Sequence, residues 1–314
     1  MPENVADLGE FGLIAAVTAR LPQGRNVLLG PGDDAAVVAA PDGRVVVATD
    51  MLVEQRHFRR DWSSAYDIGR KAAAQNLADI VAVGARPTAL LLGLGAPPDL
   101  PADWVLQVAD GMRDESTPLG ASVVGGDTVW SDAVVLAVTA LGDLGGRDPV
   151  TRSGARPGDI VAVCGRLGWA AAGLRLLSRG SRTPRALVDA YHRPEVPYDA
   201  AYAAMDLGMT AMCDVSDGLL ADVGHIAQAS GVAIDLDPDA LRADPPVAET
   251  ARLLGEDAER WVLTGGEDHA IVATFGAGVT LPDPWRVVGR VIAGSGVTVR
   301  GERYPGAEGY RHFS

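Results

Sequence analysis

Runs of apolar residues alternate with polar turns along the chain and predict strands and helices in turn. From Val27 the sequence reads as a strand, a turn rich in Gly, Pro and Asp, a second strand and a third at 45–48. Later runs predict helices at 102–117, 168–177 and 219–230, and strands at 121–124, 133–141, 160–163, 209–213 and 269–274. A corner is expected at 125–128, a polar loop at 189–197 and an interdomain connection at 145–158. We therefore expect two α/β domains of similar size.

One predicted helix is apolar almost all round and carries a narrow polar stripe. Ser64 followed by Asp67 is typical of a capping box, and Gly84 is expected to end the helix. The remaining positions are mostly Ala, Leu, Ile and Val, so the helix should be buried. Buried polar side chains need partners, which makes the stripe a candidate for function. Its members are Lys71, Gln75, Asn76 and Asp79.

Composition excludes some classes of function. The chain has 314 residues, 47% of them apolar, and a formal net charge of −14, which fits a soluble globular protein with two domains. This charge argues against nucleic acid or an anionic membrane surface as a partner, because either would repel it. Lys71 is the only lysine, so a phosphate loop of the Gly-Lys-Ser/Thr type is excluded.

Cysteine usage and the first residues indicate a cytoplasmic protein. Cys164 and Cys213 lie in apolar runs without metal-ligand spacing, which favours two reduced thiols over a disulfide. The first seven residues are acidic where a signal peptide would be basic. No uncharged apolar run approaches the roughly 18 residues of a membrane span.

Five aspartates stand where apolar runs end, and they provide the main chemical indication. If they converge, each close pair repels by about 4 kcal/mol at about 4 Å with an effective dielectric near 20, so a shared site needs divalent metal. Hard carboxylate oxygens suit magnesium, which also bridges to phosphates. The pattern therefore favours magnesium-dependent phosphoryl transfer. The five are Asp34, Asp50, Asp79, Asp127 and Asp214.

Each motif also has a structural interpretation. The Gly-Asp pair before Asp34 is ordinary turn chemistry, and Ser216 could cap a helix with Asp217 in its first turn. The same helix start could hold a phosphate on its N–H groups. Gly-Gly-Glu-Asp at 265–268 could be a tight loop, while His57 and Arg152 could be surface residues.

Seven motifs in the same order resemble the thiamine-monophosphate kinase family from about residue 30 to the C-terminal Gly-Tyr-Arg-His-Phe at 309–313. They are Gly-Pro-Gly-Asp-Asp-Ala-Ala-Val at 30–37, Thr-Asp-Met-Leu-Val at 49–53 followed by His57-Phe58, Asn-Leu-Ala-Asp at 76–79, Gly-Gly-Asp-Thr at 125–128, Arg-Ser-Gly-Ala-Arg-Pro-Gly-Asp at 152–159, Asp-Val-Ser-Asp-Gly-Leu at 214–219, and Gly-Gly-Glu-Asp at 265–268.

The resemblance implies an aminoimidazole ribonucleotide synthetase-like α/β (α+β) fold. Residues 1–145 would bind ATP and magnesium and form a strand barrel with a second copy in a homodimer, and residues 146–314 would form an α/β domain that completes the site. Implied magnesium ligands are Asp34, Thr49, Asp50, Asp79, Asp127, Asp214 and Asp217. Implied ATP contacts are Gly126, Asp127, Arg152 and Ser216; implied substrate contacts are His57, Glu267 and Tyr310.

The implied reaction transfers the γ-phosphoryl group of ATP to thiamine monophosphate, the last step of thiamine diphosphate biosynthesis. A phosphate monoester has its second pKa near 6, so direct in-line transfer needs no general base. The chain departs from the family pattern at Ala48 (often serine), His269 (often tyrosine) and Tyr310 (often tryptophan).

Other functions remain open at this point. Within the same superfamily, a synthetase of the aminoimidazole ribonucleotide or selenophosphate type is the first alternative. The selenophosphate type would need a reactive Cys or selenocysteine near the N-terminus. From other classes, a metal or nucleotide sensor and a two-metal nuclease fit acidic corners, although a nuclease should carry some basic surface.

Overall fold

The computed structural model describes residues 4–31 and 35–310, and its chain divides into two compact units. The first unit comprises Met1–Ile80 and Ala85–Asp148; the second comprises Val81–Gly84 and Pro149–Ser314. None of the described helices combines the length and apolar content needed to cross a bilayer.

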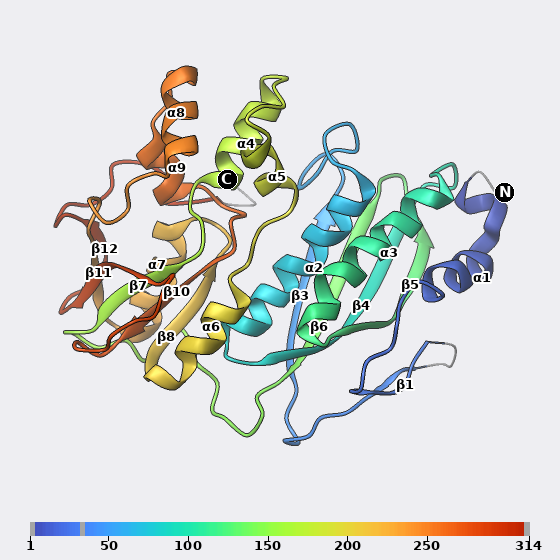
Figure 1. Ribbon diagram of the computed structural model, residues 1–314, viewed down its shortest axis with the longest axis horizontal. Coiled ribbons are helices and arrows are strands. Elements are labelled where there is room, and N and C mark those ends of the chain that lie inside the picture. The colour runs from blue at the N-terminus through green and yellow to red at the C-terminus, as the bar shows by residue number, and fades with distance from the viewer. Residues whose placement is uncertain (1–3, 32–34, 311–314) are drawn as a thin grey trace. The chain divides into compact units, whose positions relative to one another are not determined.

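The first unit is built on a four-stranded sheet with strand order β3-β6-β4-β5. Strands β4 and β5 are parallel and the other pairs are antiparallel. Helices α2 and α3 lie in front of the sheet in Figure 1. The elements are α1 (Val5–Thr18), β1 (Val27–Leu29), β2 (Val37–Val38), β3 (Val46–Val53), α2 (Ala65–Ala82), β4 (Arg86–Ala96), α3 (Ala102–Ser116), the 3-10 turn Thr117–Leu119, β5 (Ser122–Trp130) and β6 (Val135–Asp143).

Helix α2 confirms the predicted capped and buried helix. Ser64 Oγ accepts a hydrogen bond from the Asp67 N–H at 3.1 Å and donates to the Asp67 carboxylate at 2.7 Å. The polar stripe is enclosed together with the apolar residues, because Lys71 is 3% exposed and Asn76 is fully buried. The stripe therefore faces the interior of the unit.

The opposite face of this sheet carries apolar side chains in contact with solvent. Thr49 pairs with Thr139, so Val47 and Met51, two positions away on β3, point to the same side as Thr49. Val129 pairs with Gly95, and Gly95 pairs with Val135. Val135 in turn pairs with the last residue of β3, which is two positions from Met51, so Val129 points to the same side as Thr49. All three apolar side chains are more than half exposed. The sheet is thus buried on one face and apolar but open on the other.

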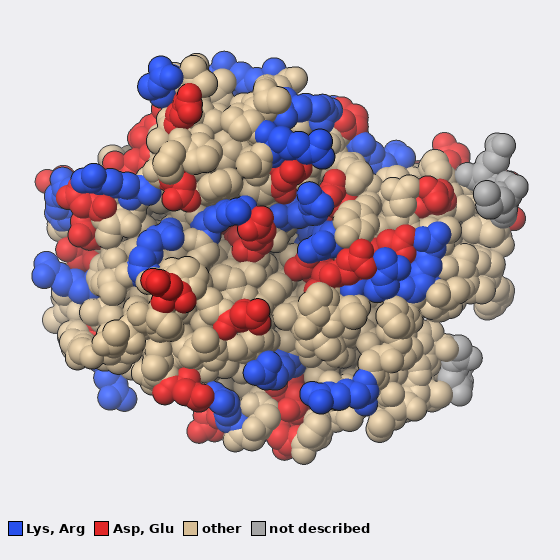
Figure 2. All heavy atoms as spheres, viewed as in Figure 1, with Lys and Arg blue, Asp and Glu red and all other residues tan. Residues whose placement is uncertain are grey.

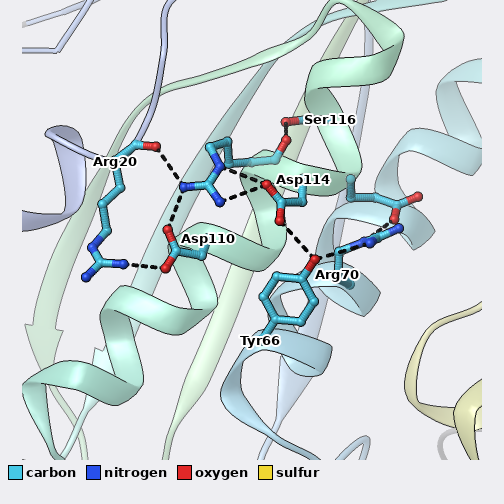
Figure 3. Close-up of polar contacts among 8 residues, drawn as sticks. Arg20, Tyr66, Arg70, Asp110, Asp114 and Ser116 are labelled. Carbon is cyan, nitrogen blue, oxygen red and sulfur yellow. Dashed lines mark hydrogen bonds and ion pairs between the residues drawn. The ribbon is translucent and has the colours of Figure 1, made fainter.

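A network of ions and hydrogen bonds ties α2 to α3 (Figure 3). Tyr66 Oη donates to the Asp114 carboxylate at 2.9 Å, and Arg70 Nε donates to the buried Glu115 carboxylate at 2.6 Å. Arg113 joins Asp114 to Asp110, which also binds Arg20. Acidic and basic side chains are interspersed over the face drawn in Figure 2, and many arginines have such carboxylate partners.

The second unit contains a six-stranded sheet with strand order β12-β9-β11-β7-β10-β8. The pairing is antiparallel except between β12 and β9. Its elements are β7 (Ile160–Cys164), α4 (Trp169–Ser178), α5 (Arg185–His192), α6 (Tyr198–Ala204), the 3-10 turn Met205–Leu207, β8 (Met209–Val215), α7 (Leu219–Ser230), β9 (Ala233–Leu236), α8 (Pro245–Leu254), α9 (Ala258–Thr264), β10 (Ala270–Phe275), β11 (Arg286–Ile292) and β12 (Gly296–Val299).

Both faces of this second sheet are covered at its centre. Val163 and Val272 belong to one apolar cluster, which includes the inner face of α7. Ala162 and Ile271, their neighbours along the strands, belong to a second cluster that includes α6. Cys164 and Cys213 are buried in these two clusters as free thiols, which confirms that part of the sequence analysis.

One predicted turn is wrong, and one predicted loop is shorter than expected. Residues 125–128 do not form a corner, because β5 continues through them to Trp130. The expected loop at 189–197 begins as helix, since α5 runs to His192 and buries Leu187, Val188 and Tyr191 on one side. Its prolines follow the helix end and do not interrupt it, and Arg193 before Pro194 is extended as the proline ring requires.

Candidate functional site

The first unit places Thr49 and Asp50 side by side on β3, pointing to opposite faces of the sheet. Thr49 Oγ1 donates to the Val138 carbonyl at 3.0 Å and lies 3.1 Å from Thr139 Oγ1. Asp50 pairs with Val138, whose side chain is on the helix-covered face. Because neighbouring residues of a strand alternate, Asp50 belongs to the covered face and Thr49 to the open face.

Helix α2 reaches β3 at Asp50 through the polar stripe. Asn76 Oδ1 accepts a hydrogen bond from the Asp50 N–H at 3.0 Å, and Asn76 Nδ2 donates to the Ala72 carbonyl at 2.9 Å. Asp79 is half-buried and lies three residues further along α2, on the side of Asn76. The structure therefore associates Asp50 and Asp79 with one face of the first unit.

Asp127 and Gly126 lie on β5, the outer strand at the other edge of the sheet. Through Gly93 and Ala137, Asp127 is in register with Met51, so it points to the open face together with Thr49. Strands β6 and β4 separate β5 from β3, which places them about 14 Å apart at about 4.8 Å per strand. This register keeps Thr49 and Asp127 apart within one chain.

Gly126 has a structural reason to be glycine. A Cβ at this position would overlap the carbonyl oxygen of Leu92 on the neighbouring strand β4. The close approach of β4 therefore explains why this position is glycine.

His57 lies in a tight turn after β3 and is half-buried. Its Nδ1 accepts a hydrogen bond from the Val53 N–H at 3.0 Å, so the neutral ring carries its proton on Nε2. Lys71 Nζ donates to the His57 carbonyl at 3.5 Å. The turn therefore connects to the polar stripe of α2.

Asp34 lies outside the described residues. Among the residues that the structure describes, no group of three or more His, Cys, Asp or Glu side chains is close enough to share a metal ion. The predicted magnesium ligands of a single chain are thus distributed over the sheet edges and α2 of the first unit and over the end of β8 in the second.

The second unit gathers five of the predicted site residues at the end of β8. The Glu267 N–H donates to the Ser216 carbonyl at 2.7 Å, and the Tyr310 N–H donates to the Asp217 carbonyl at 2.9 Å. Asp214, the fifth of the group, pairs with Ile271 on β10. Residues that lie 51 and 93 positions further along the chain therefore meet the acidic corner, defined as residues 214–218.

Asp214 is buried against His269. The Asp214 carboxylate lies 3.0 Å from His269 Nδ1, and both side chains are almost completely buried. The pair is therefore a buried local contact in the interior of the second unit. It includes one of the positions where this chain departs from the family pattern.

The alternative interpretation of Ser216 as a helix cap is wrong, and Asp222 instead accepts hydrogen bonds from the turn that precedes α7. Helix α7 begins at Leu219 with Gly218 as its cap residue. Asp222 Oδ2 accepts hydrogen bonds from the N–H groups of Asp217 and Gly218, each at 3.1 Å. These N–H groups are consequently occupied by a side chain of the same helix. Burial, followed by the charges of Asp214 and Asp217, raises the pKa of Asp222 to about 7.

Sequence reasoning missed Asp222, although its position carried an indication. Positions 219, 222, 223 and 226 follow the spacing of a helix face, and three of them are apolar. A carboxylate within such a face becomes buried and needs nearby hydrogen-bond donors.

Arg152 is exposed in the second unit, on the segment leading to β7. Its carbonyl accepts a hydrogen bond from Ser230 Oγ at 3.0 Å, which attaches this segment to the end of α7.

Asp268, next to Glu267, caps α4 by accepting hydrogen bonds from the Gly168 and Ala170 N–H groups at 2.5 and 2.7 Å. Its burial raises its pKa to about 7, although both backbone donors act in the opposite direction.

Taken separately, the two units offer different chemistry. The first presents oxygens that can bind a metal ion and a histidine N–H that can donate a hydrogen bond. Its Asp127 is exposed, and Asp50 and Asp79 are half-buried. The second presents a fixed acidic corner beside an exposed arginine and an exposed tyrosine. Carboxylate and hydroxyl oxygens are hard ligands suited to magnesium, and arginine and histidine donors suit phosphate.

Comparison with known proteins matches most of the chain. The AIR synthase related protein N-terminal domain matches residues 32–144, and the corresponding C-terminal domain matches residues 156–302. The thiamine-monophosphate kinase of Mycobacterium tuberculosis (strain H37Rv) is 51% identical over 312 residues, which cover 99% of this chain and 93% of that protein. The thiamine-monophosphate kinase of Corynebacterium glutamicum is 44% identical, with coverages of 92% and 87%.

Solved structures agree with these matches. Thiamine-monophosphate kinase from Stenotrophomonas maltophilia K279a has a TM-score of 0.82 at 34% identity and covers 93% of this chain and 96% of its own. A structure described as AaThiL complexed with AMPPCP and TMP has a TM-score of 0.81 at 31% identity, with 98% coverage of both chains. The hydrogenase maturation protein HypE of E. coli, at 20% identity and a TM-score of 0.75, shares the fold. The resemblance drawn from the seven motifs is confirmed: this mixed α/β chain of two domains belongs to the thiamine-monophosphate kinase family.

Proposed function

We propose that this protein transfers the γ-phosphoryl group of ATP to thiamine monophosphate, giving thiamine diphosphate and ADP. Full-length matches to thiamine-monophosphate kinases support the reaction. The observation that carries it is the 98% mutual coverage with a structure that holds AMPPCP and TMP. In the second domain, main-chain hydrogen bonds join Glu267 to Ser216 and Tyr310 to Asp217, so proposed contacts of both substrates lie together at the acidic corner.

The donor set of the chain fits magnesium. Thr49, Asp50, Asp79, Asp127, Asp214 and Asp217 supply hydroxyl and carboxylate oxygens, with Asp34 as a further candidate in the sequence. When bound, magnesium would neutralise charge on the phosphates and on the transferring phosphoryl group. A protein with a net charge of −14 needs such cations to accept two anionic substrates.

The residues of the chain bind and orient the substrates. Gly126, Asp127, Arg152 and Ser216 would contact ATP, and the exposed Arg152 guanidinium can donate to phosphate oxygens. His57, with its proton on Nε2, can donate to the phosphate of the acceptor, and Glu267 and Tyr310 would contact its thiamine part. No residue is assigned as a general base, because the acceptor phosphate is already largely deprotonated at neutral pH.

We also propose a homodimer in which the open sheet faces of two first domains meet and their strands form a barrel. Val47, Met51 and Val129 support this arrangement, because an apolar sheet face in water is a candidate interface. Residues 1–145 and 146–314 remain the proposed functional domains. Two free buried thiols are compatible with a cytoplasmic setting.

An ADP-release assay with magnesium tests the function. Thiamine monophosphate, free thiamine and formylglycinamidine ribonucleotide are offered separately as acceptors. We expect ADP release with thiamine monophosphate and formation of thiamine diphosphate in equal amount. Release with formylglycinamidine ribonucleotide instead would point to a synthetase of the same superfamily, and ATP binding without ADP release to a sensor.

A further inference from the structure

The peptide groups around Asp217 are held from two directions. The Asp217 N–H donates to Asp222 Oδ2 at 3.1 Å, and the Asp217 carbonyl accepts from the Tyr310 N–H at 2.9 Å. A second main-chain bond, from the Ala221 N–H to the Glu308 carbonyl at 3.1 Å, joins the first turn of α7 to the same C-terminal segment. The segment Glu308–Tyr310 is thus attached at one end to the first turn of α7 and at the other end to the acidic corner.

Gly309 makes this attachment close. A Cβ at Gly309 would lie 2.7 Å from both the Ala221 Cβ and the Asp217 carbonyl oxygen. Any side chain at this position would therefore push the segment away from the corner. The position of the Asp217 carbonyl and the absence of a side chain at 309 together determine where Tyr310 lies.

Asp222 is placed to fix the Asp217 peptide. It is 2% exposed, and a single oxygen receives both N–H groups of the turn. Burying a carboxylate near the charges of Asp214 and Asp217 is unfavourable, and the two N–H donors of the turn offset part of this cost. Its hydrogen bonds orient the peptide whose other end receives the C-terminal segment.

We propose that Asp222 is a positioning residue: by accepting the Asp217 and Gly218 N–H groups, it orients the Asp217 carbonyl that docks the C-terminal segment, and so sets Tyr310 for the thiamine part of the acceptor. This inference rests on the proposed function, because it takes Tyr310 as a contact of thiamine monophosphate. It adds a residue that acts through the main chain and does not touch the substrate.

Two conservative variants separate geometry from charge. Asp222→Asn keeps an acceptor oxygen at the same distance and removes the charge, whereas Asp222→Glu keeps the charge and moves the oxygens by one methylene. We expect Asp222→Asn to behave as the parent protein. We expect Asp222→Glu to raise the KM for thiamine monophosphate by roughly tenfold to a hundredfold, the usual range for a supporting residue, with little change in kcat or in the KM for ATP.

Hydrogen exchange at the Tyr310 amide reports docking directly. This N–H is bonded to Asp217 in the parent protein, so Asp222→Glu should accelerate its exchange and Asp222→Asn should not. Asp268→Glu is the matched control, because Asp268 is also a buried cap in the second unit but bonds to α4. This control should lose stability without faster exchange at Tyr310.

Gly309→Ala tests the same route without altering the core. It should raise the KM for thiamine monophosphate as Asp222→Glu does, and the double variant should show little further increase, because both changes release one segment. Additive effects, or equal impairment in Asp222→Asn and Asp222→Glu, would overturn the proposal. If the parent protein releases no ADP with thiamine monophosphate, the proposed function itself fails, whereas an active parent with unchanged Gly309→Ala refutes the docking route alone.

Discussion

The sheets of the two units differ in how completely the chain covers them. In the second unit, β7 and β10 are buried on both faces, between the cluster that includes α7 and the cluster that includes α6. In the first unit, α2 and α3 cover one face, and the other exposes Val47, Met51 and Val129. The second sheet is completed by its own chain, whereas the first leaves an apolar surface that a partner can cover.

The same difference applies to the predicted site residues. In the second unit, main-chain hydrogen bonds join Glu267 to Ser216 and Tyr310 to Asp217. The first unit distributes Thr49 and Asp127 over the two outer strands of its sheet. The corner is thus complete within one chain, and the proposed dimer would have to complete the other part. Four predictions test this contrast.

The largest effect is expected at Asp127. Asp127→Asn should lower turnover at least about a hundredfold. The substitution removes a proposed ligand of the magnesium that would stabilise the charge on the transferring phosphoryl group. Stability should stay unchanged, since the side chain is exposed. The measurement is ADP release with thiamine monophosphate, alongside denaturant unfolding. Asp132→Asn, an exposed carboxylate in the following turn, is the control; near-normal turnover of Asp127→Asn would remove this residue from the site.

The second largest effect is expected at the open face of the first sheet, where a single charge should separate the proposed dimer. Met51→Glu places a charge on the apolar face and should halve the molar mass measured by light scattering, with loss of activity and retention of the fold. Leu253→Glu, at a 67% exposed leucine on α8, should leave the mass unchanged. A Met51→Glu protein with the parent mass would show that this face is not the interface.

Valine truncation compares the two sheets directly. Val272→Ala, at a fully buried position of β10, should cost about 2–3 kcal/mol of unfolding free energy. Val47→Ala should cost less than about 0.5 kcal/mol in the Met51→Glu background, where the face stays exposed. Urea unfolding of both variants measures the difference. Equal costs would mean that the first sheet is already covered within the monomer.

The smallest effect concerns pH and the cap of α4. Asp268 has its pKa raised from 3.8 to about 7, mainly by burial. The folded state therefore binds its proton more tightly than the unfolded state does, so unfolding free energy falls as pH rises from about 4 to about 7. Asp268→Asn cannot ionise and should flatten this part of the profile. Denaturant unfolding at several pH values decides; parallel profiles for both proteins would contradict the assignment.

Local pattern predicted much of the fold. The Ser64 cap, the apolar surroundings of Lys71 and the stop at Gly84 all act within a few residues, and α2 has the expected limits. The corner expected at 125–128 failed because pairing with β4 continues the strand, and Gly126 is needed for close strand packing. Tertiary pairing overrode local turn preference at this point.

The site was predicted as a set of residues, and their arrangement was not. Motifs identified Asp214, Asp217 and Glu267, and the fold brings the corner together. The role of Asp222 depends on the direction in which the chain enters α7, which the Ser-Asp-Gly sequence alone does not specify. The separation of Thr49 from Asp127 depends on strand order, which sequence periodicity does not contain.

The burial of Lys71 has a practical consequence. The chain has one lysine side chain, and the fold leaves it 3% exposed beneath the turn of His57. Reagents that acylate lysine should therefore spare this ε-amino group in the native protein and modify it once α2 separates from that turn. Mass spectrometry after brief acylation would then measure the rate at which the first domain opens, from the extent of modification at Lys71.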